Sequence, residues 1–395
     1  MYVHLPFCAH RCGYCDFVTV VGRSAEHESY ADALLADLEL ARPQLAERLD
    51  TVFVGGGTPS YTEQPALVRV LAALPDANEV TVEANPETVT PELAALLRDG
   101  GVTRVSLGAQ SFDASLLGVL ERRATPDDVR RAVHALRDAC FDNISLDLLY
   151  GIPGQSAAQL ERDLAEALAL APEHLSCYEL EAKPGTRFSH AWGDELGRQA
   201  EAMEGYFARV VERLEMAGFR WYETANFCRS LERDGRQRDL RAQHNLAIWR
   251  GHDYVGIGVG AVSTVAGERR RNDPSLRRYE VALRDGVPPP GAVESLDEST
   301  QALERVMLGL RLDEPLTLSQ GLESVIDREA LERLRERGLV ARSVDVGSVA
   351  ARVSLTRRGR FLGGAVTAEL LRWPEDGDEL TRVEPAGTGA TRLAG

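Results

Sequence analysis

The order of apolar and polar positions in the first half of the chain predicts a parallel sheet. Short apolar runs of strand length alternate with longer stretches whose apolar residues recur at helical spacing. The predicted strands span residues 2–7, 51–54, 80–84, 102–107, 143–149 and 175–180, and the predicted helices span 30–40, 65–74, 91–98, 126–139 and 157–170. Parallel strands need a right-handed crossover, which is usually a helix, so the alternation predicts an α/β fold with an incomplete (β/α)6 barrel.

The regular alternation ends near residue 185, which we expect to close the barrel domain, residues 1–185. An extension, 186–290, follows, with a helix at 194–217, a strand at 219–224, an exposed arginine-rich loop at 229–241 and a glycine-rich apolar strand at 256–263. Beyond a Pro/Gly linker at 286–291, the segment 291–373 predicts a small winged-helix-like α+β domain that packs against the barrel mouth. The Gly-, Pro- and Asp-rich residues 374–395 predict a disordered tail.

Composition excludes some classes of function. The net charge of −16 argues against a general nucleic-acid binder, which needs basic surface to displace counterions from phosphate. There is no apolar stretch of about twenty residues and no charged leader, so we expect a cytoplasmic protein. Cysteine use fits a reducing compartment, and Cys140, Cys177 and Cys228 are expected to be buried thiols.

A loop directly after the first predicted strand carries Cys8, Cys12 and Cys15 in the spacing C-x3-C-x2-C. Three thiolates cannot close a four-iron cluster, so this spacing suggests a [4Fe-4S] cluster with one iron open to a small molecule. The alternative is a structural zinc site with His10 as fourth ligand. It is disfavoured because His10 lies inside the loop and no second Cys/His cluster follows.

Further polar or glycine-rich features fall at the carboxyl ends of the predicted strands, where a parallel barrel places its chemistry. The run Gly55-Gly-Gly-Thr-Pro-Ser60 follows the second strand, Glu83 ends the third, Gln110 follows the fourth and Asp147 ends the fifth. Glycines there would let the backbone approach a ligand without a Cβ clash. The two carboxylates lie in apolar runs and need partners, and ligand contact and structural hydrogen bonding are equally open for each.

Together these motifs resemble the radical S-adenosylmethionine superfamily, and within it the HemW branch of the coproporphyrinogen III oxidase-like family, the heme chaperones. The resemblance runs from Tyr2 to the last predicted helix. It rests on Tyr2-Val-His-Leu-Pro-Phe-Cys8, Tyr14-Cys-Asp-Phe17, the run from Gly55 to Pro59, Gly108-Ala-Gln-Ser-Phe112, Asp147-Leu-Leu-Tyr-Gly-Ile-Pro153 and His244-Asn-Leu-Ala-Ile-Trp249.

Two features separate the branches of that family. The dehydrogenases resemble C-x3-C-x2-C-x-C, whereas Phe17 stands here at the fourth cysteine position. The chaperone branch also carries the His-Asn-x-x-x-Trp element. A lone histidine is more often core or surface, but the resemblance implies that His244 binds heme iron, with apolar cover from Ile248 and Trp249. The chain departs from the family in a longer segment before His244, in Gln243 where arginine is common, and in Ile248 where tyrosine is common.

By the same resemblance, the three loop cysteines hold a [4Fe-4S] cluster that binds S-adenosylmethionine. The expected contacts of that cofactor are Tyr2, Gly56, Gly57, Thr58, Glu83, Gln110, Arg122, Asp147, Glu181 and Val262. Arg122 would pair with a carboxylate of the cofactor, or alternatively form an ion pair with Glu121 or Asp127.

The resemblance implies a heme chaperone that delivers heme to respiratory apoproteins, with transient membrane association, no nucleic-acid partner and no coproporphyrinogen dehydrogenase activity. Two alternatives stay open. One is the oxygen-independent coproporphyrinogen III dehydrogenase, which decarboxylates propionate side chains by radical chemistry. The other is a different radical enzyme that modifies tetrapyrroles.

Overall fold

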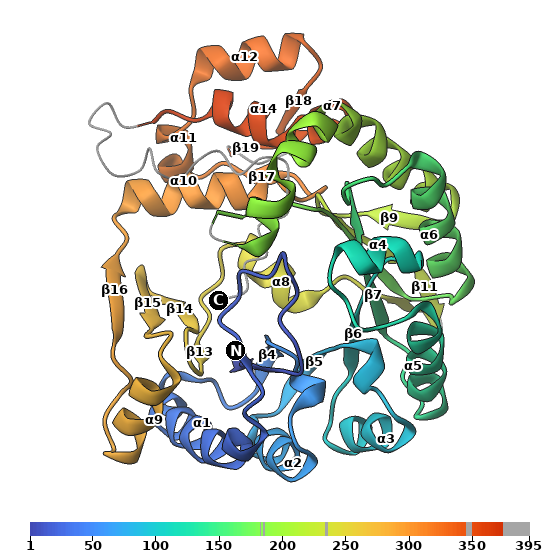
Figure 1. The fold of residues 1–395 in the computed structure, drawn as a ribbon. Coiled ribbons are helices and arrows are strands. Elements are labelled where there is room, and N and C mark those ends of the chain that lie inside the picture. Colours follow the sequence, from blue (N-terminus) through green and yellow to red (C-terminus); the bar gives the residue numbers. More distant parts are fainter. Residues whose placement is uncertain (182, 185, 234–235, 345–349, 374–395) are drawn as a thin grey trace.

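A nine-stranded sheet is the centre of the part described by the computed structural model, which comprises residues 1–181, 183–184, 186–233, 236–344 and 350–373 (Figure 1). Its order is β13 (Gly256–Ile257), β1 (Tyr2–Leu5), β4 (Leu49–Gly56), β5 (Ala77–Ala84), β6 (Arg104–Gln110), β7 (Ile144–Tyr150), β8 (His174–Glu179), β10 (Asn226–Arg229) and β9 (Phe219–Trp221). Pairing is parallel from β13 to β8, whereas β10 and β9 are antiparallel. The described strands β13 and β9 do not pair with each other, so the sheet forms an open barrel, and the predicted fold class is confirmed.

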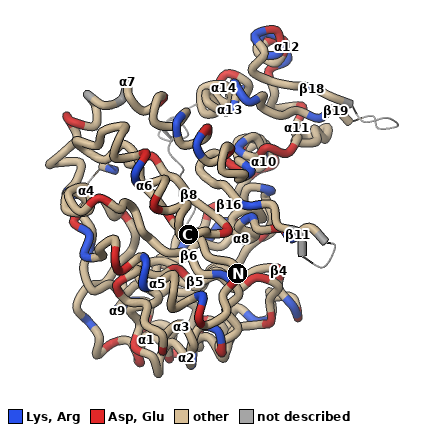
Figure 2. Tube along the Cα trace, turned by 90° about the vertical axis from the view of Figure 1, so that its right-hand side faces the viewer, with Lys and Arg blue, Asp and Glu red and all other residues tan. Residues whose placement is uncertain are grey.

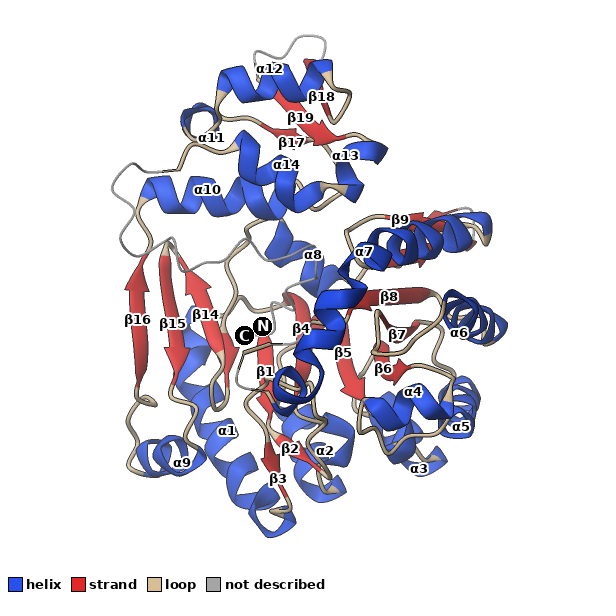
Figure 3. Ribbon diagram, turned by 45° about the horizontal axis from the view of Figure 1, so that its top comes forward, coloured by secondary structure: helices blue, strands red, loops and turns tan. Residues whose placement is uncertain are grey.

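Helices cover the outer face of this sheet (Figure 3). Those between the strands are α1 (His27–Ala41), α2 (Gln64–Ala73), α3 (Pro91–Asp99), α4 (Ala114–Val119), α5 (Pro126–Asp138) and α6 (Ala157–Ala169). Local sequence fixes where several of them begin. Thr125 and Asp128 form a capping box ahead of α5, and Ser156 and Gln159 form one ahead of α6. Each box satisfies backbone N–H groups that have no partner within the helix.

Successive strand residues alternate between the helical shell and the barrel interior. Val52 and Val54 of β4 belong to the main hydrophobic core together with residues of α1 and α2. The alternate residues Thr51 and Phe53 face inward, where both contact His244. The interior of the barrel therefore carries polar and aromatic side chains, and the outer face of the sheet carries aliphatic ones.

The extension after β8 differs from the prediction in two places. Helix α7 (Arg187–Met216) begins earlier than expected, because Thr186 caps it by accepting the N–H of Ser189. The arginine-rich segment is not an exposed loop, since it forms β10 and a hairpin of β11 (Leu231–Arg233) and β12 (Arg236–Arg238). Two of its arginines have partners, since Arg238 pairs with Asp142 at 2.8 Å and Arg229 lies over the ring of Phe219.

A second, antiparallel sheet follows β13 along the chain. It contains β14 (Val262–Val265), β15 (Glu268–Asn272) and β16 (Gly291–Ser295), and α9 (Leu276–Arg284) packs against α1. The predicted apolar glycine-rich strand at 256–263 is thus split between β13 and β14. A Cβ on Gly256 would lie 2.1 Å from the carbonyl oxygen of Val262, so the chain can turn this tightly only at glycine.

The C-terminal segment has its own hydrophobic core, formed by residues between Ala302 and Leu371. Its elements are α10 (Glu298–Gly309), β17 (Leu316–Thr317), α11 (Gln320–Ser324), α12 (Arg328–Glu336), β18 (Val340–Val344), β19 (Ala351–Leu355), α13 (Arg357–Phe361) and α14 (Gly363–Leu370). We call residues 298–371 the C-terminal module. The predicted domain boundaries stay predictions, and the predicted tail, 374–395, lies outside the described residues.

The C-terminal module packs against the amino-terminal side of the barrel. Asp313 forms an ion pair with Arg220 of β9. Arg220 pairs with Cys228 of β10, and Cys228 pairs with His174, the first residue of β8. These contacts lie at the amino ends of the parallel strands, and the predicted packing against the barrel mouth stays a prediction. Within the described residues, no helix combines the length and the apolar character needed to cross a bilayer.

Candidate functional site

The cysteine loop lies at the carboxyl end of β1 and is held by contacts from three directions. Cys8 ends the short strand β2 (Phe7–Cys8), which pairs with β3 (Val20–Val21). Thr58 donates to the Cys8 sulfur at 3.4 Å, and Arg122 donates to the Cys12 sulfur at 3.5 Å. The start of α7 also reaches the loop, since the Phe188 N–H donates to the Gly13 carbonyl at 3.1 Å.

The donor set fits a cluster better than a single ion. Among the described residues, no group of three or more His, Cys, Asp or Glu side chains could hold one metal ion, and His10 instead faces Glu121 at 4.0 Å. In a four-iron cube each thiolate binds a different iron, so the thiols need not converge on one point. Burial raises the pKa of the Cys8 thiol to about 11, and metal binding would reverse this because a coordinating thiol is deprotonated. Three cysteines of one loop therefore fit a cluster with one iron left to another ligand.

Asn85 connects the glycine run with Arg122 and was not anticipated from the sequence. Its amide donates to Thr58 Oγ1 at 3.2 Å, and its Oδ1 accepts from Arg122 at 3.0 Å. Arg122 also donates to the Gly108 carbonyl at 2.8 Å. The available signal was the Asn-Pro pair directly after β5, which marks a turn at the carboxyl rim.

The ion pairs considered for Arg122 are not formed. Glu121 pairs with Arg187, and Asp127 pairs with Arg130 at 2.7 Å. Arg122 therefore contacts the loop cysteine and neutral acceptors, and within the described part its Nε is buried without a hydrogen-bond partner.

The two inward-facing carboxylates have partners, as their burial requires. The Gly56 N–H donates to Glu83 Oε2 at 3.3 Å, and Ser106 Oγ lies 3.2 Å from both oxygens of Asp147. Tyr2 is close enough to Glu83 for that charge to add to burial in raising its pKa. Asp147 lies at the middle of β7 and not at its end, because the strand continues to Tyr150.

Buried polar atoms without partners mark where a polar ligand would fit. Within the described part these include Gln110 Oε1 and Glu181 Oε1, besides Arg122 Nε. Gln110 also has a positive φ of 64°, a strained conformation that is common where side chains meet ligands. Glu181 pairs with Lys183. Val262 begins β14, and its neighbour Ala261 packs with Tyr2.

The structure gives the glycine run a packing function. A Cβ on Gly57 would lie 2.4 Å from the Pro6 carbonyl oxygen, and a Cβ on Gly56 would lie 2.5 Å from the His4 ring. Gly56 also has a φ of 111°. Close packing against β1 therefore requires glycine at both positions, whether or not a ligand approaches.

His244 lies at the opposite end of the barrel, on the short helix α8 (Gln243–Trp249). Its ring Nδ1 is 2.9 Å from Thr51 Oγ1, and the ring stacks on Phe53. The backbone N–H of His244 donates to Glu79 Oε1 at 3.2 Å. Thr51 and Glu79 are paired in the first halves of β4 and β5. Glu83 follows Glu79 by four residues, so the polar rim is roughly 13 Å along the strand from His244.

A buried polar cluster continues from Glu79 across this end of the barrel. Arg104 donates toward His174 Nδ1 at 3.3 Å, and His174 Nε2 is 2.7 Å from the Tyr222 hydroxyl. That hydroxyl accepts from the Ala242 N–H, one residue before α8. Burial lowers the pKa of both His244 and His174 well below the usual value, so both imidazoles are neutral.

Trp249, the last residue of the His-Asn-x-x-x-Trp element, faces the C-terminal module. It packs with Tyr222 and with Leu312, and the partly buried Leu308 completes this cluster. A different face of α8 borders a cavity of about 340 Å³, which is lined by Gln243 and Ala247 of the helix and by Arg250 directly after it. Residues at the amino ends of β4 to β7 also line this cavity.

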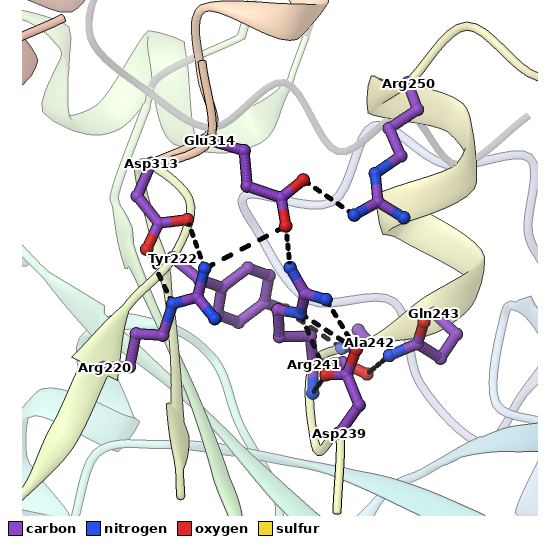
Figure 4. Close-up of polar contacts among 9 residues, drawn as sticks. All are labelled: Arg220, Tyr222, Asp239, Arg241, Ala242, Gln243, Arg250, Asp313 and Glu314. Carbon is purple, nitrogen blue, oxygen red and sulfur yellow. Dashed lines mark hydrogen bonds and ion pairs between the residues drawn. The ribbon is translucent and has the colours of Figure 1, made fainter. Parts of the chain in front are cut away.

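Ion pairs join α8 to the C-terminal module (Figure 4). Glu314 contacts Arg241, which precedes α8, and Arg250, which follows it, the second at 2.7 Å. The adjacent Asp313 pairs with Arg220 of β9 at 2.7 Å, and Arg220 also lies 4.0 Å from Glu314. None of these contacts was predicted, because the partners lie far apart in the sequence.

Comparison with known proteins agrees with this geometry. Residues 2–167 match the family model of the radical SAM superfamily. The chain is 35% identical over 384 residues to the heme chaperone HemW of Mycobacterium tuberculosis (strain CDC 1551 / Oshkosh), covering 94% of each protein. It is 32% identical over 389 residues to HemW of Bacillus subtilis (strain 168), covering 94% of this chain and 98% of that one.

A solved structure supports the fold. Coproporphyrinogen III oxidase (HemN) from Escherichia coli superimposes with a TM-score of 0.75 at 21% sequence identity, covering 93% of this chain and 88% of that one. This match concerns the fold alone. The sequence matches to HemW proteins extend over nearly the whole chain, and the resemblance inferred from the motifs is confirmed. The chain therefore belongs to the HemW family of the radical SAM superfamily.

Proposed function

We propose that this protein binds heme through His244 and delivers it to heme-requiring respiratory apoproteins, while a [4Fe-4S] cluster and S-adenosylmethionine occupy the carboxyl rim. Its relatives named heme chaperone support heme handling, and its membership of the radical SAM superfamily supports the two rim cofactors. In this proposal the protein meets membranes only transiently and has no nucleic-acid partner.

The observation that carries the proposal is the position of α8. His244 contacts the first halves of β4 and β5, whereas the cysteine loop follows the end of β1. A substrate propionate would have to lie beside the cofactor at the rim, because a reacting group must be within contact distance. A porphyrin held by His244 would lie roughly 13 Å along the strands from the carboxyl rim. The geometry therefore favours holding heme over decarboxylating its precursor.

The rim residues have binding and orienting roles in this proposal. The cluster and S-adenosylmethionine together supply one-electron chemistry when bound. Gln110 and Glu181 offer buried acceptors to the amino group of the cofactor, and Arg122 offers its Nε–H to the carboxylate. Thr58 and Asn85 keep Cys8 and Arg122 in place from the neighbouring strand ends.

The test is the absorption spectrum of heme added to the reconstituted protein. Replacing His244 by alanine removes the iron ligand, so the Soret band should shift or vanish while the cluster absorption remains. His134→Ala, an exposed histidine of α5, is the matched control and should leave the spectrum unchanged. An unchanged Soret band in His244→Ala would contradict the ligand assignment.

The same reconstituted protein separates chaperone from dehydrogenase. Under anaerobic, reducing conditions with S-adenosylmethionine, we expect no conversion of coproporphyrinogen III. Formation of protoporphyrinogen would contradict the chaperone proposal and favour the radical decarboxylase.

A further inference from the structure

The heme motif is closed in this structure. The His244 side chain is buried, its Nδ1 is engaged by Thr51 and its ring lies against Phe53. Trp249 is packed against the C-terminal module. A porphyrin is a large flat ligand, and it cannot reach the imidazole while both residues keep these contacts. Heme binding through His244 therefore requires α8 to move.

The cavity beside α8 shows which movement would suffice. Gln243 and Ala247 of α8, and Arg250 directly after it, line the cavity at helical spacing and so share one face. His244 and Ile248 follow Gln243 and Ala247 by one residue each. One residue corresponds to roughly 100° of rotation in an α-helix, so a roll of that size would turn His244 and Ile248 toward the cavity.

Glu314 is placed to oppose that roll. Its two carboxylate oxygens contact Arg241 and Arg250, one on each side of α8, so a single side chain of the C-terminal module holds both ends of the helix (Figure 4). A roll moves both guanidinium groups away from the carboxylate. The Arg241 side chain is only 13% exposed and is also paired with Asp239, whereas the Arg250 side chain is 34% exposed.

The remaining contacts of α8 with the C-terminal module are apolar or neutral. Leu308 and Leu312 pack in the cluster of Trp249, and Arg305 donates to the Trp249 carbonyl at 3.4 Å. These contacts lie at the carboxyl end of α8. Among the described residues, Glu314 alone forms ion pairs on both sides of the helix.

We propose that Glu314 is a positioning residue that keeps α8 in the closed state, so that the C-terminal module controls access of heme to His244. This inference rests on the proposed function. If α8 opens before heme binds, the rate of uptake is proportional to the population of the open state. Weakening the closed state should then accelerate uptake and leave the final spectrum unchanged.

The experiment is stopped-flow mixing of hemin with the full-length protein, followed at the His244-dependent Soret band. Glu314→Gln removes the ion pairs with Arg241 and Arg250, and the longer 4.0 Å contact with Arg220, with little change of shape. Partly exposed pairs of this kind predict an acceleration of about fivefold. Asp313→Asn is the matched control. It removes an ion pair of the same module that does not touch α8, so the rate should stay at the wild-type value.

A second variant keeps the test decisive if Glu314→Gln does not fold. Arg250→Gln removes one of the two ion pairs and should accelerate uptake by a smaller factor. Uptake rates of both variants equal to or below that of Asp313→Asn would contradict the proposal that Glu314 keeps α8 closed. A Soret band that does not depend on His244 in any variant would contradict the proposed function itself. The two failures are distinguishable, because unchanged uptake rates can be measured only where the Soret band does depend on His244.

Discussion

At the scale of single residues, Asp163 of α6 shows how a family motif can be structural. Its carboxylate accepts from Ser111 Oγ at 2.8 Å and from the Phe112 N–H at 2.6 Å, which anchors the residues directly after Gln110. Burial raises its pKa from 3.8 to about 6 in spite of these hydrogen bonds. The buried carboxylate of Asp163 thus fixes the end of the motif from Gly108 to Phe112 by hydrogen bonds.

This raised pKa predicts a dependence of stability on pH. The unfolded chain loses the Asp163 proton near pH 4 and the folded chain near pH 6. The stabilisation of the folded state by protonated Asp163 is therefore full below pH 4 and is lost as pH rises through 6. Relative to Asp163→Asn, which stays neutral, the wild type should lose about 2 kcal/mol of unfolding free energy between pH 4 and 7. Urea denaturation of both proteins across that range measures the difference.

Asp113→Asn is the control for this prediction. Hydrogen bonds from Ser115 and Gln159 lower the pKa of Asp113 to about 2, so its stabilisation is lost only as pH falls toward that value. Its difference from the wild type should therefore stay nearly constant from pH 4 to 7. A constant difference for Asp163→Asn as well would show that its carboxyl group titrates normally.

Gly56 carries a second prediction at this scale. Alanine there would combine a left-handed backbone with a Cβ 2.5 Å from His4, so it should lower the free energy of unfolding by about 2 kcal/mol or more, with or without S-adenosylmethionine. Gly101→Ala is the control, because it has a φ of 80° but no atom within 4 Å of the added Cβ. Equal losses in the two variants, measured by urea denaturation, would contradict the clash with His4.

At the scale of elements, the sequence predicted what short-range patterns encode. Each of the six predicted parallel strands is present, because a continuous apolar run marks a strand covered on the outside by helices. The cysteine loop and Asn-Pro turn follow strand ends, where the same patterns place them. The start of α7 was missed although Thr186 caps it and Phe188, Trp192 and Leu196 recur at helical spacing.

Long-range contacts explain the other differences. β13 joins the sheet beside β1, which precedes it by more than two hundred residues, and no local pattern reports such a pairing. The surroundings of His244 are similar, since Thr51 and Glu79 belong to strands near the start of the chain. Cys140 was expected to be buried but is exposed, because it takes a positive φ of 63° in the turn after α5.

At the scale of the whole molecule, charge is distributed in pairs. Acidic and basic positions are interspersed along the trace in Figure 2, and many arginines are paired with a carboxylate, as Arg137 is with Glu173 and Arg311 with Glu223. With a net charge of −16, this arrangement does not offer the basic surface that nucleic acids need. Much of the arginine content therefore serves internal contacts.

Helix α7 connects the two ends of the barrel. Its first turn contacts the cysteine loop through Phe188 and Arg187, and Glu215 in its last turn contacts Arg357 of the C-terminal module. At 30 residues it is roughly 45 Å long. One helix thus contacts both the cysteine loop and the C-terminal module. Thermodynamic linkage then sets a condition: any factor by which S-adenosylmethionine changes heme affinity must equal the factor by which heme changes the affinity for S-adenosylmethionine.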